Sequence, residues 1–274
     1  MPIAALLLAL AAAFVHAGWN LLLSDAEDTH AATAVAVLTG VVLFAPVAAL
    51  SWRLEGSAVP FIAGSSATEV LYLGLLATAY SVAAMSFVYP IARGSAPVLV
   101  LAASVIALGA RLSLPAALGV VLVGGGIVLV RGVGGAARPR DLALALAVGA
   151  CIAGYTLIDK RGIEHGAPIS YLEIVFGATA VAYALGVVSV KGVEAVRAAV
   201  SRSAVLAGAG FFGAYALTLA ALRLAPAASV AAVRESSVVI AAVALAVSGR
   251  EHIGTQRLAG ALAVVGGIAL VSLG

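Results

Sequence analysis

Charged side chains are scarce in this sequence, and their scarcity excludes a soluble protein. Asp, Glu, Lys and Arg supply 10% of the 274 residues and hydrophobic residues supply 64%, and the mean hydropathy is +1.18. Soluble domains have about 25% charged and about 45–50% apolar residues. Since so few polar side chains cannot cover a water-facing exterior, most of the surface must face lipid.

Cysteine and clustered charge are also rare. The single cysteine, Cys151, excludes an internal disulfide and a cysteine-based metal site. The net charge is only +3, and the basic residues are scattered singly, without a basic patch for nucleic acid or a polybasic tail for anionic lipid. We therefore expect no cofactor, no metal and no nucleic-acid partner.

Long apolar runs are abundant instead, and they lack the alternation of a barrel strand. Only helices and closed barrels satisfy the backbone in lipid, so the runs indicate helices. A window of about 20 residues predicts ten transmembrane helices near 3–23, 31–51, 68–89, 93–110, 113–131, 141–160, 168–190, 203–222, 227–248 and 254–272. We expect an all-α membrane protein whose function lies within its helices, because the loops are too short for a soluble domain.

An internal repeat divides the chain. The glycine-rich segment 119–130 recurs as 260–271, segment 17–20 as 153–156, and segment 79–80 as 214–215. The chain then consists of a first five-helix repeat at 1–131, a linker at 132–139 and a second repeat at 140–274. Because five crossings is an odd number, the second repeat must enter the membrane inverted. Inverted repeats are typical of secondary transporters with a site near the bilayer midplane.

The sequence resembles the drug/metabolite transporter superfamily, in particular its ten-helix EamA-type members. The resemblance is carried by residues 16–20, 89–97 and 224–238, and by the turn at 249–251 before the last helix. That turn reads Gly-Arg-Glu, a permuted form of the Gly-Glu-Arg-like turn of the family. The resemblance implies transport, commonly export, of a small metabolite across the cytoplasmic (inner) membrane of a bacterium.

Arg93 and Arg234 are the most informative polar residues, because a charge inside a span is costly. Arg234 aligns with Gly94, the neighbour of Arg93, which places both guanidinium groups at equivalent depths of the fourth and ninth spans. Guanidinium binds carboxylate and phosphoryl groups bidentately, so we expect both arginines to bind substrate. The structural alternative is that Arg93 reaches the membrane interface and that Arg234 only pairs with Glu235.

His16, Trp19 and Asn20 share one face of the first span, at positions i, i+3 and i+4. A titratable ring, a flat aromatic and an amide suit the wall of a binding site. Their counterparts in the sixth span are Tyr155 and Thr156, and we expect all five residues to line the substrate site. The alternative is hydrogen bonding that only holds the helices together.

Tyr80 and Tyr215 are repeat counterparts in the third and eighth spans. We expect them to close the substrate site from opposite sides. Tyrosines are also common at membrane interfaces, which is the competing structural interpretation.

Coupling and gating are assigned to one acid and three prolines. Glu235 is the acid expected to lie deepest, and a buried carboxylate can carry a coupling proton, although the adjacent Arg234 favours its ionised form. Pro90, Pro97 and Pro226 stand at or inside the fourth and ninth spans. Proline removes a backbone donor, and breaks at corresponding places of two repeats indicate hinges.

Three further acids are interpreted as structural. Glu69 and Glu173 fall in the first turns of their predicted spans, where a helix N-terminus favours an anion. Asp159 belongs to a charged cluster after the sixth span, which predicts a solvated turn.

These observations rank the possible functions. A multidrug-type exporter of hydrophobic cations is the alternative to a metabolite transporter, but aromatics are only 6% of the chain and the arginines repel cations. Neither a Walker motif nor a hydrolase motif occurs, so we do not expect an enzyme. The expected partners are a small-molecule substrate, the lipid bilayer and a proton as coupling ion, and we expect a monomer or homodimer.

Overall fold

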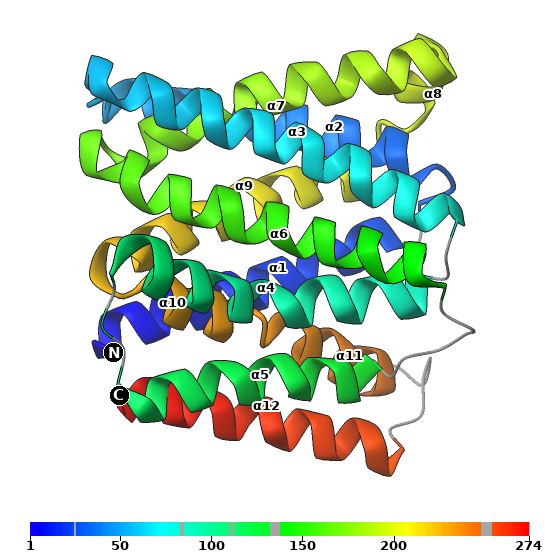
Figure 1. Ribbon diagram of the computed structural model, residues 1–274. Coiled ribbons are helices and arrows are strands. Elements are labelled where there is room, and N and C mark those ends of the chain that lie inside the picture. Colours follow the sequence, from blue (N-terminus) through cyan, green and yellow to red (C-terminus); the bar gives the residue numbers. More distant parts are fainter. Residues whose placement is uncertain are drawn as a thin grey trace.

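The protein is a bundle of helices in the computed structural model (Figure 1). The model describes residues 1–24, 26–82, 85–109, 111, 113–131, 138–247 and 254–273, without the side chains of residues 24, 77, 80, 81, 85–87, 89, 90, 107, 108, 130, 131, 245 and 257. The α-helices are α1 (Ile3–Ser24), α2 (Thr29–Leu50), α3 (Val59–Val82), α4 (Met85–Leu108), α5 (Leu114–Arg131), α6 (Pro139–Gly162), α7 (Pro168–Lys191), α8 (Val193–Ala198), α9 (Arg202–Leu224), α10 (Ala227–Arg234), α11 (Ser237–Val247) and α12 (Thr255–Leu273). Two 3-10 turns, Gly56–Ala58 and Ile163–His165, complete the helical elements.

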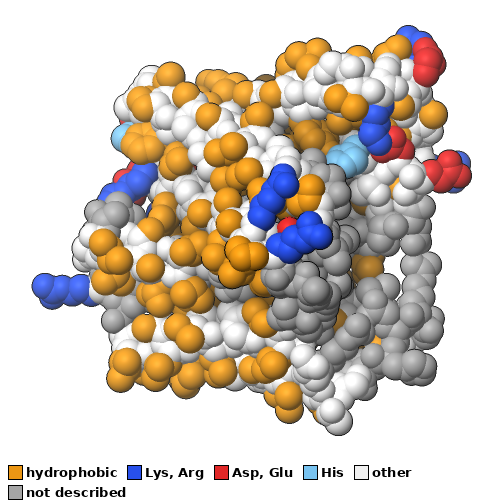
Figure 2. All heavy atoms as spheres, turned by 45° about the vertical axis from the view of Figure 1, so that its right-hand side comes forward, with side chains coloured by type: hydrophobic (Ala, Val, Ile, Leu, Met, Phe, Trp, Pro, Cys, Tyr) orange, Lys and Arg blue, Asp and Glu red, His pale blue; other side chains and the backbone are white. Residues whose placement is uncertain are grey.

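Seven of the described helical segments are long and apolar enough to cross a membrane, which makes the chain a multi-pass membrane protein. They are Ile3–Leu23, Thr29–Leu50, Gly56–Leu76, Pro139–His165, Pro168–Lys191, Arg202–Leu224 and Ala227–Ala244. Three shorter apolar segments follow the same pattern, Ile91–Ile106, Leu114–Leu129 and Leu258–Leu273. Figure 2 shows hydrophobic side chains spread over the visible face, as lipid contact requires.

Local sequence explains where several helices begin and end. Asp28 caps α2 by accepting hydrogen bonds from the backbone N–H groups of His30 and Ala31, both at 3.1 Å. Pro168 starts α7 at a position where no helical N–H is needed. The same helix ends at Gly192, whose φ of 81° is a conformation that glycine adopts without steric cost.

The helices pack in pairs that each join one half of the chain to the other. Helix α3 packs along α6, α1 along α9, α2 along α7, and α5 along α12. The two chain ends lie together at one end of the bundle (Figure 1), where the Met1 ammonium donates to the Ser272 carbonyl at 2.9 Å. Side chains near the centre of the bundle are therefore held in place by contacts between the two halves.

Glycines bring α5 and α12 into backbone contact. A Cβ atom added at Gly119 would lie 2.5 Å from the carbonyl oxygen of Gly267, and one added at Gly126 would lie 2.8 Å from that of Gly260. Gly119 aligns with Gly260, and Gly126 aligns with Gly267, in the sequence repeat. The two contacts are thus reciprocal, as in a pair of antiparallel helices related by a twofold axis.

We predict that Gly126→Val destabilises the protein, whereas Gly125→Val does not. The Gly126 variant would force a side chain into the Gly260 backbone, and such overpacking costs about 1–3 kcal/mol. Gly125 is the matched control because it is exposed and has nothing within 4 Å of an added Cβ. The midpoint of thermal unfolding in detergent measures both variants. Equal midpoints for the two variants would contradict the close packing.

The expected span at 227–248 is broken in its middle, and not at a proline. Helix α10 ends at Arg234, and α11 begins at Ser237. At the break the Glu235 N–H donates to the carbonyls of Ala231 and Ala232, at 3.3 and 3.2 Å, and the regular ladder resumes when Ile240 N–H donates to the Ser236 carbonyl at 3.0 Å. Because the sequence is apolar on both sides, a hydropathy window shows one continuous span and does not predict this break.

An ion pair joins Asp28, just before α2, to Lys191, the last residue of α7. Lys191 Nζ lies 2.8 Å from both carboxylate oxygens of Asp28. The hydrogen bond from Lys191, followed by that from the Ala31 N–H, holds the pKa of Asp28 below its ordinary value. Because the folded pKa is the lower one, the stabilisation is present above the unfolded value near about 4 and is lost as the pH falls through the folded value.

We predict that Asp28→Asn lowers the unfolding midpoint slightly at pH 7 and removes this acid dependence. Asparagine still caps the helix, so the variant isolates the charge. The side chains of Asp28 and Lys191 are 33% and 35% exposed, and solvent screening limits the effect to less than about 1 kcal/mol. Unfolding midpoints between pH 3 and pH 7 test this, with the exposed Glu194→Gln as control. Parallel curves for wild type and Asp28→Asn would show that the pair contributes nothing.

Candidate functional site

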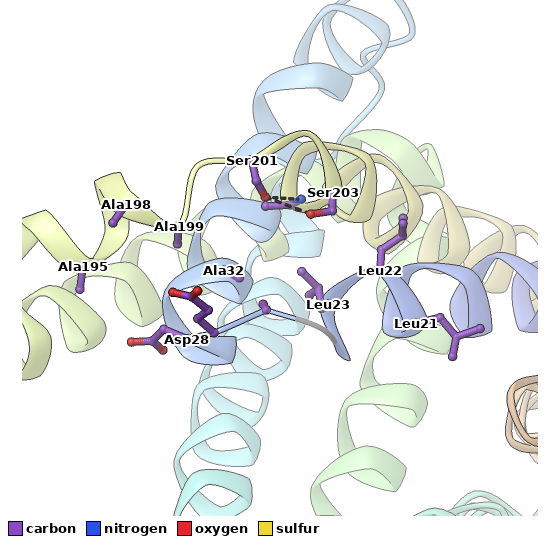
Figure 3. A pocket seen from close by; sticks show the side chains of 13 residues that line it. Leu21, Leu22, Leu23, Asp28, Ala32, Ala195, Ala198, Ala199, Ser201 and Ser203 are labelled. Carbon is purple, nitrogen blue, oxygen red and sulfur yellow. Dashed lines mark hydrogen bonds between the residues drawn. The ribbon is translucent and has the colours of Figure 1, made fainter. Parts of the chain in front are cut away.

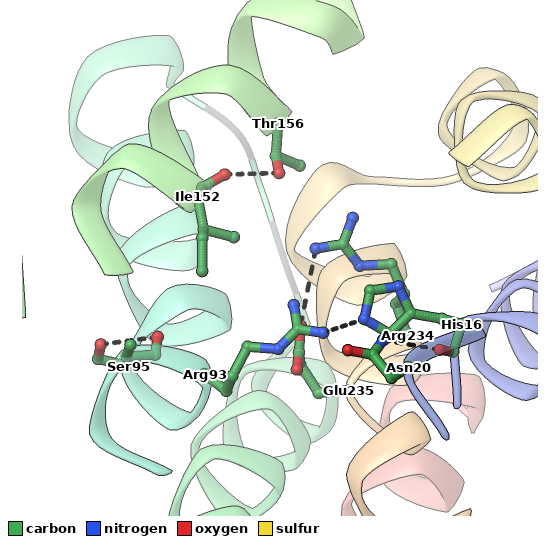
Figure 4. A network of polar contacts seen from close by, with 9 residues as sticks. His16, Asn20, Arg93, Ser95, Ile152, Thr156, Arg234 and Glu235 are labelled. Carbon is green, nitrogen blue, oxygen red and sulfur yellow. Dashed lines mark hydrogen bonds and ion pairs between the residues drawn. The ribbon is translucent and has the colours of Figure 1, made fainter. Parts of the chain in front are cut away.

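A buried ionic network joins three helices at the centre of the bundle (Figure 4). Arg93 on α4 places Nη1 3.2 Å from Oε1 of Glu235, at the break after α10. Arg234 Nη2 lies 3.7 Å from the same oxygen. Arg93 Nη2 also contacts Nε2 of His16 on α1. The residues at 93, 234 and 235 are 7%, 5% and 1% exposed, so this network is shielded from solvent.

The hydrogen-bond roles fix the charge of the histidine. A guanidinium group has only donors, so His16 Nε2 accepts from Arg93 and the imidazole is neutral. Glu235 therefore pairs with two guanidinium groups through one oxygen. Its second oxygen, Oε2, and Arg234 Nε are buried without a hydrogen-bond partner among the described residues. Two guanidinium groups at one carboxylate, with unused hydrogen-bonding capacity, suit an anionic group.

Tyrosines form the wall beside Arg234. The guanidinium carbon of Arg234 lies 5.9 Å from the centre of the Tyr215 ring on α9, within cation–π range. The Tyr215 ring meets that of Tyr155 on α6 edge-on at 6.1 Å, and Tyr155 meets Tyr72 on α3 at 6.0 Å. The wall therefore contains helices from both halves of the chain.

Two buried carboxylates lie on the other side of Tyr215, contrary to their interpretation as caps and turns. Asp159 is 0% exposed, within α6, and it accepts hydrogen bonds from the hydroxyls of Tyr171, at 2.8 Å, and Tyr215. Glu69 lies in the middle of α3 and is 7% exposed, because that helix begins at Val59 and not just before the acid. Thr179 donates to Glu69 at 3.1 Å. Neither acid is solvated, so both need a functional or structural explanation.

Comparison with known proteins agrees with a transporter. Residues 141–273 match the model of the EamA-like transporter family. This segment of the chain, which is nearly half of it, is thus similar to a family of membrane transporters. That family is part of the drug/metabolite transporter superfamily, as its sequence motifs indicated. No curated protein was found to match the chain.

The fold of this EamA-like protein also occurs among solved structures. One, titled only "Crystal structure of protein", superposes with a TM-score of 0.78 over 98% of this chain and 98% of the other, at 19% sequence identity. At that identity the likeness shows the fold alone.

The structure of the EamA-like protein places the remaining expected residues unevenly. Trp19 packs edge-on against His16 at 5.0 Å, and its indole Nε1 is buried without a hydrogen-bond partner in the described part of the chain. Asn20 donates to the His16 carbonyl at 2.8 Å, and Thr156 donates to the Ile152 carbonyl at 2.7 Å. The side chains of Asn20 and Thr156 therefore form hydrogen bonds within their own helices. His16 belongs to the network, and Trp19 packs beside it.

The residues assigned to gating are placed as follows. Pro97 is buried inside α4, which continues through it, and Pro226 is the residue before the first turn of α10. The side chains of Tyr80 and Pro90 lie outside the described residues. A helix boundary thus lies at Pro226, none lies at Pro97, and a further interruption lies at Glu235 and Ser236.

Two surface hollows lie away from the network. One, of about 720 Å³, is lined mainly by leucines and alanines near Asp28 (Figure 3). Its Ser201 caps α9 by accepting a hydrogen bond from the Ala204 N–H at 3.2 Å. The other, of about 370 Å³, contains Lys160 and Arg223. Both of those cations donate to backbone carbonyls at the ends of α9 and α6. Ser201, Lys160 and Arg223 thus serve helix ends, and we take the ionic network as the candidate site.

Proposed function

We propose that the protein is a secondary transporter that exports a small metabolite bearing a carboxylate or phosphoryl group. The observation that carries this proposal is the pair of buried guanidinium groups, Arg93 and Arg234, that share the single carboxylate of Glu235. An incoming anion can take over part of the coordination that Glu235 now supplies. Because the surroundings are buried, such charge-assisted bonds are strong.

The proposed architecture is ten crossings in two inverted repeats, 1–131 and 140–274, in a bacterial inner membrane. Support comes from the reciprocal glycine contacts of α5 and α12, and from the paired packing of α3 on α6 and α1 on α9. In this arrangement the ionic network lies between the repeats, where secondary transporters hold their substrates.

Alternating access would then proceed by rocking of one repeat against the other, with the interruption between α10 and α11 as a hinge. Arg234 and Glu235 stand at that interruption. A substrate anion that bound the arginines in place of the Glu235 carboxylate would alter the contacts that hold the two half-helices to α4. Substrate binding and the hinge are therefore coupled through the same residues, as a population shift requires.

Lipophilic cations are the second candidate substrate class. They are favoured by a specific observation, namely the buried acids Asp159 and Glu69 beside the tyrosine wall. A cation could stack on those rings and pair with a carboxylate. The arginines oppose this, since Arg234 lies over the Tyr215 ring of the same wall.

A thermal-shift screen of the purified protein in detergent separates the two classes. The panel contains organic acids, phosphorylated compounds, amino acids and lipophilic cations. A ligand present at 100 times its dissociation constant adds about 2.7 kcal/mol to the folded state. Stabilisation by carboxylates or phosphoryl compounds, lost in Arg234→Ala, is the expected result. Stabilisation by lipophilic cations alone would instead assign both arginines to structure.

A further inference from the structure

The buried acids Asp159 and Glu69 have no role in the anion site, although both lie close to it. They come from α6 and α3, two helices that pack together and belong to different halves of the chain. Among the described residues neither acid forms a salt bridge. Carboxylates buried in a membrane protein without a paired cation are costly when ionised, so this arrangement calls for a proton.

The surroundings of Asp159 combine opposing influences. Tyr171 and Tyr215 each donate a hydroxyl to one of its oxygens, which stabilises the ionised form. Complete burial opposes the ionised form of Asp159, and its carboxylate lies within electrostatic range of Glu69. Two such carboxylates within electrostatic range cannot both ionise easily, so the pair favours retention of one proton.

A third buried polar group, a serine hydroxyl, lies beside the pair. Ser65 on α3 is 0% exposed, and its hydroxyl has no hydrogen-bond partner among the residues that the structure describes. The same hydroxyl lies within interaction range of Asp159 and Tyr171. A serine hydroxyl both donates and accepts, so Ser65 can donate to the ionised carboxylate of Asp159 and accept from the protonated one.

The remaining charged groups connect the pair to the anion site. Arg234 on α10 is the cation within electrostatic range of both Asp159 and Glu69. From α4, Arg93 faces Glu235 and His16 instead. Tyr215 forms the physical link, because its hydroxyl binds Asp159 and its ring lies under the Arg234 guanidinium.

We propose that Asp159 and Glu69 form a proton-binding site coupled to the anion site through Tyr215 and Arg234. The inference deepens the transport proposal and rests on it for its role in the cycle. Protonation of Asp159 removes a counter-charge from Arg234, which then has more positive charge to offer an anion. By linkage, a bound anion favours the protonated acid equally. Proton and anion then cross together, and export runs down the concentration gradient of the metabolite itself.

The experiment needs no substrate, so it can fail independently of the transport proposal. Infrared difference spectra of the protein in liposomes are recorded during a pH titration in sodium-free buffer, where a protonated carboxyl gives its own carbonyl band. We expect such a band in wild type at neutral pH, and its loss as the pH rises. Asp159→Asn and Glu69→Gln should each remove or shift the band. Glu164→Gln is the control, since its side chain is 53% exposed, and should leave the band unchanged.

Two more variants test the coupling and protect against misfolding. Arg234→Gln removes the cation that faces the acids, so the band should persist to a pH about 1 unit higher. Tyr171→Phe removes one hydroxyl donor, keeps the ring and should move the band in the same direction. A wild-type band that survives Asp159→Asn and Glu69→Gln unchanged would overturn the proton site. A band whose loss requires added sodium would overturn it in favour of a sodium site, and an unchanged midpoint in Arg234→Gln would overturn the coupling.

Discussion

Replacing Glu235 with alanine is expected to lower the free energy of unfolding by about 3–5 kcal/mol, because it leaves buried guanidinium groups without their counter-charge. Arg93 and Arg234 both pair with Oε1 of this residue, which is 1% exposed. Desolvated cations facing each other would repel, and Glu235 is the described carboxylate that pairs with both. The thermal unfolding midpoint in detergent, converted with the unfolding enthalpy, measures the loss.

The matched control for Glu235→Ala is Glu194→Ala. Glu194 pairs with Arg197 at 2.7 Å, but the two side chains are 78% and 70% exposed. Exposed pairs contribute about 0–1 kcal/mol, so the control variant should unfold almost with the wild type. If both variants behaved alike, the ionic network would have no special role in holding α4 to the interrupted helix.

The second large effect concerns binding. Arg234→Ala is expected to weaken a carboxylate or phosphoryl ligand about 10- to 100-fold, since a hydrogen bond to a charged group is worth about 1.5–3 kcal/mol and about 1.4 kcal/mol corresponds to tenfold in affinity. Arg234→Lys keeps the charge but loses the forked geometry, so its affinity for the anion should lie between those of the wild type and Arg234→Ala. Calorimetric titration with the best anion of the screen measures all three proteins.

Two controls make the Arg234 result specific. Arg197→Ala removes an exposed guanidinium far from the network and should bind as the wild type does. A neutral amide analogue of the same ligand should bind the wild type and Arg234→Ala with similar affinity. If Arg234→Ala weakened the amide as much as the anion, the arginine would act on the fold and not on the charge of the substrate.

Much of the fold follows from hydropathy and from the repeat. Lipid leaves the backbone no alternative to helices, so the apolar runs coincide with helices such as α2 and α7. The glycine-rich segments 119–130 and 260–271, which revealed the repeat, are also the segments through which α5 and α12 pack. The break between α10 and α11 was missed, because residues on both sides are apolar and hydropathy does not record hydrogen-bond geometry.

The candidate site was less accessible from the sequence. Arg93 and Glu235 are 142 positions apart in the sequence, so their contact could not be predicted, and only the repeat suggested that Arg93 and Arg234 lie at similar depths. Asp159 was missed because the sixth span was ended one residue after it, whereas α6 continues to Gly162. A signal was present, since Asp159 continues the helical face of Ile152 and Tyr155 at spacings of three and four residues.

Glu69 was misread for the same kind of reason. The third span was expected to begin at residue 68, while α3 begins at Val59 and places the acid in mid-helix. The polar residues of 64–69 lowered the hydropathy at the point where the helix is buried against α6 and α7. Polar residues that serve a buried site thus resemble a loop in any pattern based on hydrophobicity.

Solute counterflow in proteoliposomes tests the central claim most directly. Vesicles containing the purified protein are loaded with a high concentration of the anion that best stabilises it, and entry of the labelled anion is followed without a pH gradient or ATP. The account predicts transient accumulation of label in wild-type vesicles, its near loss in Arg234→Ala, and its retention in Arg197→Ala. Accumulation of lipophilic cations but of no carboxylate or phosphoryl compound, or equal accumulation in Arg234→Ala and wild type, would contradict it.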